Sequence, residues 1–196
     1  MDTGQITAPP RAVSVARQVL ALGVDSPTGV EVGVFRGEFS VALDSLVPRL
    51  TLYMVDCWAT PDPESDYAKT GDGIARLPQT RQEMFYNRVL AKAKTMHDAI
   101  VIRAYSPGEA EAFSSMPQDF VFIDADHSKS GVLADLRGWW PVVRPGGLLC
   151  GHDWGIHGVK PALEEWLPTV GASTADIVRG EDMTWFLKKP AQNAQG

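Results

Sequence analysis

Acidic and imidazole side chains stand where two strand-like runs of the sequence end, and these residue types bind divalent cations or move protons. They are Asp124, Asp126 and His127 at the end of the run 119–125, and His152 and Asp153 at the end of the run 146–152. A single Asp in such a place is more often the cap of a following helix, and a single His is more often a hydrogen-bonded rim residue. Chemistry therefore requires a fold that brings the two groups together.

Apolar runs that read as strands alternate along the chain with segments long enough to carry helices. The expected strands cover 29–34, 50–56, 99–104, 119–125 and 146–152, with a final strand at 183–187. Helices are expected at 10–23, from a candidate capping box at 80–83 onward, at 130–140 and at 159–167. This alternation predicts an α/β fold with a doubly wound, mostly parallel sheet. Because the apolar runs are nearly continuous, the strands should be covered by helices on both faces.

Length and composition indicate one domain over 1–190, followed by a disordered tail at 191–196, in a chain of 196 residues that is 44% hydrophobic. Lys and Arg number 18 against 24 Asp and Glu, and a net charge of −6 offers no electrostatic footprint for nucleic acid or an anionic membrane. The expected partners are small molecules or other proteins, a second copy of the chain included. No apolar run has the length of a signal-peptide core or a membrane span, which predicts a cytoplasmic location. The two cysteines, Cys57 and Cys150, are expected to be reduced thiols.

The segment 57–78 is longer than an ordinary connecting loop in a compact α/β domain, and its sequence is CWATPDPESDYAKTGDGIARLP. Loops of this length and composition are either covers of a binding site or mobile surface loops. If the segment covers a site, Trp58 and Tyr67 are its candidate contact residues.

A glycine motif at the end of the first strand predicts the kind of ligand. Glu31, Gly33 and Gly37 form an E-x-G-x-x-x-G pattern, in which Phe35 occupies the place of the second glycine of a dinucleotide fingerprint. A side chain there would obstruct a pyrophosphate. Asp56, at the end of the second strand, is placed to accept hydrogen bonds from ribose hydroxyls. The pattern favours a nucleoside without a diphosphate; the alternative is turn glycines beside a solvated acid.

Four segments, VEVGVFRGEFS, LYMVDCW, DFVFIDADHS and RPGGLLCGHDW, together resemble the class I S-adenosylmethionine-dependent methyltransferases. The resemblance runs from about 29 to 154 and is to the small single-domain group related to metal-dependent O-methyltransferases of catechols and macrolide sugars. It implies a seven-stranded sheet of order 3-2-1-4-5-7-6. The donor-binding set that it implies is Glu31, Gly33, Phe35 and Gly37 near the methionine end, Asp56 on the ribose, Ser106 near the adenine, and Asp124.

The implied strand order places the fourth and fifth strands side by side, so their polar ends meet beside the methyl donor. Asp124, His152 and Asp153 are then candidate ligands of one divalent cation, and such donors suit Mg²⁺ or Mn²⁺. Asp126 is a further candidate for the same site. Catechol-type enzymes carry an Asp-Asn pair where this chain has His152 and Asp153, which leaves metal identity and metal dependence open.

The resemblance implies methyl transfer to a hydroxyl of a small molecule, with Asp124 and His127 as catalytic residues. His127 is the expected general base because it lies three residues beyond the proposed metal ligand Asp124, where related catechol enzymes carry a lysine base, and His152 is its rival. The alternatives are a non-catalytic S-adenosylmethionine-binding regulatory domain and a metal-dependent hydrolase. The remaining histidines, His97 and His157, are expected at the surface, and the pair Trp139–Trp140 is expected to pack a helix.

Overall fold

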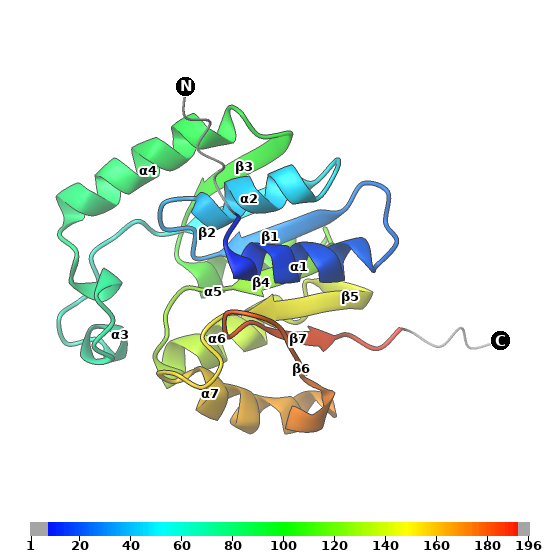
Figure 1. Cartoon of the computed structure of the whole chain (residues 1–196). Helices are drawn as coiled ribbons and strands as arrows, with labels where there is room; N and C mark the ends of the chain where they lie inside the picture. Colours follow the sequence, from blue (N-terminus) through cyan, green and yellow to red (C-terminus); the bar gives the residue numbers. More distant parts are fainter. Residues whose placement is uncertain (1–7, 192–196) are drawn as a thin grey trace.

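The computed structural model describes residues 8–191, which form one seven-stranded sheet with helices on both faces (Figure 1). The strands are β1 (Thr28–Val32), β2 (Thr51–Asp56), β3 (Asp98–Arg103), β4 (Gln118–Ile123), β5 (Val143–Gly151), β6 (Val178–Arg179) and β7 (Trp185–Lys188). Their order is β3-β2-β1-β4-β5-β7-β6, as expected. The first five strands pair in parallel and β7 pairs antiparallel with both β5 and β6. The sheet therefore reverses its order between β1 and β4, where doubly wound folds bind ligands.

The helices form two layers. One layer contains α1 (Pro10–Leu20), α2 (Glu38–Leu46) and α4 (Gln79–Ala93), and the other contains α5 (Ser106–Glu109), α6 (Lys129–Trp139) and α7 (Val159–Trp166). The short helix α3 (Asp66–Lys69) and a 3₁₀ turn at Ile74–Arg76 lie within the 57–78 loop. Further 3₁₀ turns are Ala110–Phe113, Leu167–Val170 and Thr174–Asp176.

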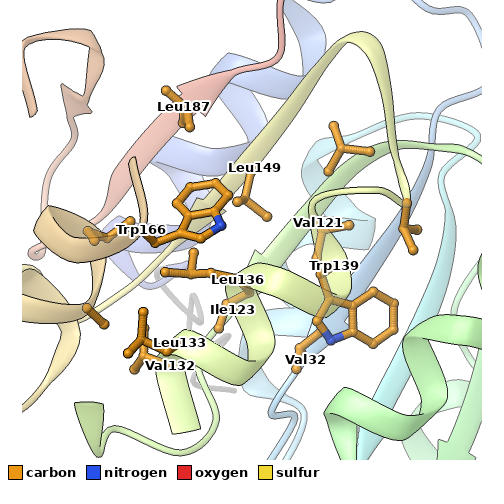
Figure 2. Close-up of a cluster of buried hydrophobic side chains, with 14 of the residues drawn as sticks. Val32, Val121, Ile123, Val132, Leu133, Leu136, Trp139, Leu149, Trp166 and Leu187 are labelled. Carbon is orange, nitrogen blue, oxygen red and sulfur yellow. The ribbon is translucent and has the colours of Figure 1, made fainter. Parts of the chain in front are cut away.

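Successive residues of each central strand point to opposite faces, so the sheet separates two apolar cores. In β4, Val121 and Ile123 belong to the core under α5, α6 and α7, whereas Phe120 and Phe122 belong to the core under α1, α2 and α4. Figure 2 shows the first core, where Trp139 of α6 lies over the strands. Trp139 is fully buried, which confirms its expected packing role.

Three local expectations are corrected. The helix α4 begins at Gln79, and Pro78 precedes it without a side-chain cap, so the box at 80–83 does not form. Gln79 Nε2 instead donates to Glu83 Oε1 at 3.0 Å. The first helix ends at Leu20 rather than at residue 23, and the strand expected at 146–152 begins earlier, at Val143. The sheet also contains the two-residue strand β6. Both cysteines are free thiols, as expected.

No helix within 8–191 is long and apolar enough to cross a membrane. The expected tail at 191–196 lies almost wholly outside the described residues.

Candidate active site

A cavity of about 200 Å³ opens where the segments after the first four strands meet. Its wall includes Gly33 to Phe35 after β1, Asp56 and Cys57 at the end of β2, Ala104 to Pro107 after β3, and Asp124 to His127 after β4. Six of the seven expected donor-binding residues line the cavity, and Gly37 does not. The cavity thus lies at the carboxyl ends of the parallel strands, at the reversal of strand order.

The glycine motif allows β1 and β4 to end side by side. Gly33 has φ +90°, and a Cβ atom there would lie 2.1 Å from the carbonyl oxygen of Asp124. Asp124 in turn donates its backbone N–H to Val32 at 2.7 Å. Gly37, at φ +74°, is the left-handed residue that precedes α2. Only glycine tolerates the first position, because both the backbone angle and the space exclude a side chain.

Asp56 holds the glycine motif in shape. Its Oδ2 accepts the backbone N–H groups of Val34 at 2.9 Å and Phe35 at 2.8 Å, and its Oδ1 accepts that of Trp58 at 2.7 Å. Burial raises the pKa of Asp56, although these three N–H groups oppose the shift. Asp56 is therefore not the solvated loop acid of the alternative interpretation. Asp56 also lines the cavity.

Glu31 and Ser106 are anchored at the same cavity. Glu31 is 1% exposed and accepts the Ser40 hydroxyl at 2.5 Å, and burial raises its pKa well above the ordinary value. Ser106 Oγ donates to Asp135 Oδ1 at 2.5 Å and accepts from Trp139 Nε1 at 2.8 Å.

Asp135, on α6, lines the cavity and was not selected from the sequence. It is 2% exposed, and burial raises its pKa to about 7 while the hydrogen bond from Ser106 opposes that shift. The sequence signal for a buried Asp135 is its helical spacing, because it falls on the same face of α6 as the buried Val132 and Leu136. A carboxylate on an apolar helix face is costly unless it is protonated or paired.

The three expected metal ligands converge. Asp124, His152 and Asp153 each offer one ligand atom, and these atoms lie within 4.8 Å of one another. The convergence follows from strand pairing, because the His152 N–H donates to the carbonyl of Ile123 at 3.1 Å. His152 Nδ1 lies 2.9 Å from Asp153 Oδ1 and 3.7 Å from Asp124 Oδ1. Two carboxylates and one imidazole form a donor set that could hold a hard divalent cation.

Three carboxylates surround His127, which is 8% exposed. Its Nδ1 lies 3.1 Å from Asp72 Oδ2, and its Nε2 lies 3.2 Å from both Asp124 Oδ1 and Asp153 Oδ2. Burial alone would lower the pKa of His127, but the hydrogen bonds with Asp124 and Asp72 raise it to about 10. The ring is therefore an imidazolium at neutral pH in this arrangement.

Asp126 helps to cap the helix that follows it, the alternative to metal binding for an acid at this position. Its Oδ1 accepts the N–H of Ser128 at 2.7 Å, and Ser128 caps α6 by accepting from Gly131. It does not belong to the group of three converging ligands.

The 57–78 loop lies against the cavity. The Tyr67 hydroxyl donates to Asp72 at 3.1 Å, and the Ser130 hydroxyl donates to Asp66 at 2.6 Å. Tyr67 lines the cavity, but the expectation for Trp58 is wrong. Trp58 is fully buried, and its Nε1 donates to the carbonyl of Phe35. The indole therefore stabilises the backbone of the glycine motif.

The two histidines expected at the surface are exposed. His97 donates its backbone N–H to Asp44. His157 also stacks on the His127 ring, with centroids 5.7 Å apart.

A family model described as a methyltransferase domain matches residues 30–154. The chain belongs to this family. No curated protein matches the chain.

The solved structures that resemble the methyltransferase share its class I fold at low identity. The O-methyltransferase NovP is 15% identical with a TM-score of 0.64, over 92% of this chain and 80% of the other. An rRNA methylase from Streptococcus thermophilus is 11% identical with a TM-score of 0.60, over 96% and 100%. MycE, solved with Mg, SAH and mycinamycin VI, is 19% identical with a TM-score of 0.53, over 93% and 50%. These likenesses confirm the expected fold.

Proposed function

We propose that the protein transfers the methyl group of S-adenosylmethionine to a hydroxyl oxygen of a small molecule, assisted by a divalent cation. The observation that supports this proposal is that Asp124 takes part in two sites. It lines the donor cavity, and it belongs to the cluster with His152 and Asp153. One residue thus adjoins both the place for the donor and the place for a cation. The net charge of −6 favours a small acceptor over a nucleic acid.

The reaction breaks the bond between the sulfonium sulfur and the methyl carbon and forms a bond between that carbon and the acceptor oxygen. The products are S-adenosylhomocysteine, a methyl ether and one proton. Because the methyl group is already activated, the protein must align the acceptor with the donor and remove the proton. Glu31, Asp56 and Ser106 are the residues we assign to the donor, and each has a fixed hydrogen-bond partner.

The carboxylates of Asp124 and Asp153 with the imidazole of His152 fit Mg²⁺ or Mn²⁺ by their donor chemistry. A cation bound there would lower the pKa of the acceptor hydroxyl and offset two of the carboxylates that hold a proton on His127. His127 is the residue we assign as the base, since its Nε2 faces that cluster. Asp72 fixes the ring from the opposite side through Nδ1. The 57–78 loop, through Tyr67, would exclude water from the acceptor.

The test is methyl transfer from labelled S-adenosylmethionine to a panel of catechols, phenols and sugar hydroxyls, with RNA as a further arm. We expect a methyl ether of a small molecule and loss of activity after chelation, restored by Mg²⁺ or Mn²⁺. Donor binding without any transfer would instead support the regulatory domain. Hydrolysis without a donor would support the hydrolase, and methylated RNA would overturn the small acceptor.

A further inference from the structure

The wall of the donor cavity contains many acidic side chains and one arginine. Among the described residues the lining contains six carboxyl groups, which are those of Glu31, Glu38, Asp56, Asp124, Asp126 and Asp135. Arg11 is the single Lys or Arg of the same lining. The His127 ring already has three carboxylate neighbours. Arg11 is therefore the cation available to an anionic group of a ligand.

Arg11 is held in place by the helix that carries it. It is the second residue of α1, whose Ala12, Val15 and Val19 are buried in the core with α2. Its Nε atom is buried and makes no hydrogen bond within the described part of the chain. Its Nη1 forms an ion pair with Asp182 Oδ2 at 3.7 Å, a distance too long for a hydrogen bond, so its N–H groups are not used there. A buried N–H donor without an acceptor is costly, so a ligand oxygen there would be favoured.

Arg11 and Glu31 line the same cavity. Burial raises the pKa of Glu31, while the hydrogen bond from Ser40 and, to a smaller extent, the positive charge of Arg11 oppose the shift. Asp182, beside Arg11, belongs to the turn between β6 and β7, whereas Ser106 follows β3 at the opposite edge of the sheet. The cavity thus has an arginine at one end and the Ser106–Asp135 pair at the other.

S-adenosylmethionine has one anionic group, the α-carboxylate of its methionine part, and two cationic groups, the ammonium and the sulfonium. The acidic wall suits both cations, while the carboxylate needs a positive partner with N–H donors. We propose that Arg11 binds the α-carboxylate of the donor. A guanidinium suits a carboxylate because its fork of N–H groups can form two parallel hydrogen bonds. This inference rests on the proposed use of S-adenosylmethionine and agrees with the donor direction that the resemblance implies, with the adenine near Ser106.

The experiment measures dissociation constants by calorimetry for three ligands. S-adenosylhomocysteine has the carboxylate, 5′-S-(3-aminopropyl)-5′-thioadenosine lacks only the carboxylate, and 5′-methylthioadenosine lacks the whole amino-acid part. The proteins are the wild type, Arg11→Gln, Arg11→Lys and, as a matched control on the exposed side of the same helix, Arg17→Gln.

We expect Arg11→Gln to weaken S-adenosylhomocysteine by about 10-fold to 100-fold, the usual worth of a hydrogen-bonded charge. The two ligands without a carboxylate should bind Arg11→Gln as they bind the wild type. Arg11→Lys should show a smaller loss confined to S-adenosylhomocysteine, because it keeps the charge but not the fork. Arg17→Gln should bind all three ligands normally.

Equal weakening of all three ligands in Arg11→Gln would show that Arg11 only supports the fold of the cavity and would overturn the proposal. Unchanged S-adenosylhomocysteine affinity in both Arg11 variants would overturn it as well. If Arg11→Gln does not fold, the same comparison in Arg11→Lys decides. Failure of the wild type to bind S-adenosylhomocysteine would reject the proposed donor itself, which is a separate result.

Discussion

Asp72 and His127 are joined across 55 positions of sequence, with 3.1 Å between Asp72 Oδ2 and His127 Nδ1. This contact links the 57–78 loop to the polar ends of β4 and β5. The same Asp72 oxygen accepts the hydroxyl of Tyr67, which lines the cavity. The loop and the imidazole are therefore ordered together, and the loop has a role beyond connection.

Replacing Asp72 by Asn should lower turnover about 10-fold to 100-fold, the usual effect of losing a residue that orients a functional histidine. Binding of S-adenosylhomocysteine should remain, because the donor residues are untouched. Steady-state kinetics and hydrogen exchange of the 57–78 loop measure the two effects. The matched control is Asp62→Asn in the same loop, because the one hydrogen bond of the Asp62 side chain within the described residues is the N–H of Glu64 that it accepts. Equal losses in both variants would refute a specific role for Asp72.

Removing one proposed metal ligand should abolish binding of Mn²⁺ measured by calorimetry. Asp124→Asn is the test, since it replaces a charged ligand of the converging cluster. Asp126→Asn is the control two residues away, because an amide oxygen can still accept the N–H of Ser128 that Asp126 accepts. Tight Mn²⁺ binding by Asp124→Asn, or its loss in Asp126→Asn alone, would contradict the assignment.

Much of the fold followed from the sequence because each central strand is buried on both faces and so leaves a continuous apolar run. Asp124, His152 and Asp153 could be predicted for the same reason: parallel strands end at one edge, so residues there must meet. Asp72 and Arg11 could not, since a loop and a terminal helix bring them in by tertiary packing alone. The capping box predicted at Thr80 does not form because Pro78, with its fixed φ, already starts α4 without a hydroxyl cap.

Gly33→Ala should destabilise the protein by about 3 kcal/mol or more, as expected for a side chain forced against backbone at positive φ. Its Cβ would meet Asp124 O at 2.1 Å. Gly71→Ala separates the two causes, because Gly71 also has positive φ, +84°, but nothing lies within 4 Å of its Cβ position. Denaturant unfolding should therefore give a smaller loss for Gly71→Ala. Similar losses would show that the approach of β1 to β4 is not what requires glycine.

Asp135→Asn should change how stability depends on pH. Because the folded-state pKa of Asp135 is raised to about 7, above an ordinary value of about 3.9, the folded protein holds this proton more tightly than the unfolded chain. The wild type therefore loses stability as pH rises from about 4 to about 7, and the variant lacks this loss. Thermal melts from pH 4 to pH 8 should show the variant gaining on the wild type up to about pH 7 and no further. A difference between Asp135→Asn and the wild type that stays constant with pH would contradict a titrating Asp135.

His127→Ala and His152→Ala distinguish the base from the metal ligand. His127→Ala should lose about 10²-fold to 10⁴-fold in turnover at saturating donor, the usual contribution of a general base, while binding S-adenosylhomocysteine and Mn²⁺ as the wild type does. His152→Ala should instead weaken Mn²⁺, because His152 offers a nitrogen to the converging cluster and His127 does not. Excess Mn²⁺ should therefore rescue His152→Ala in part and leave His127→Ala slow. The opposite pattern of rescue would exchange the two roles, and loss of donor binding in His127→Ala would remove it as the base.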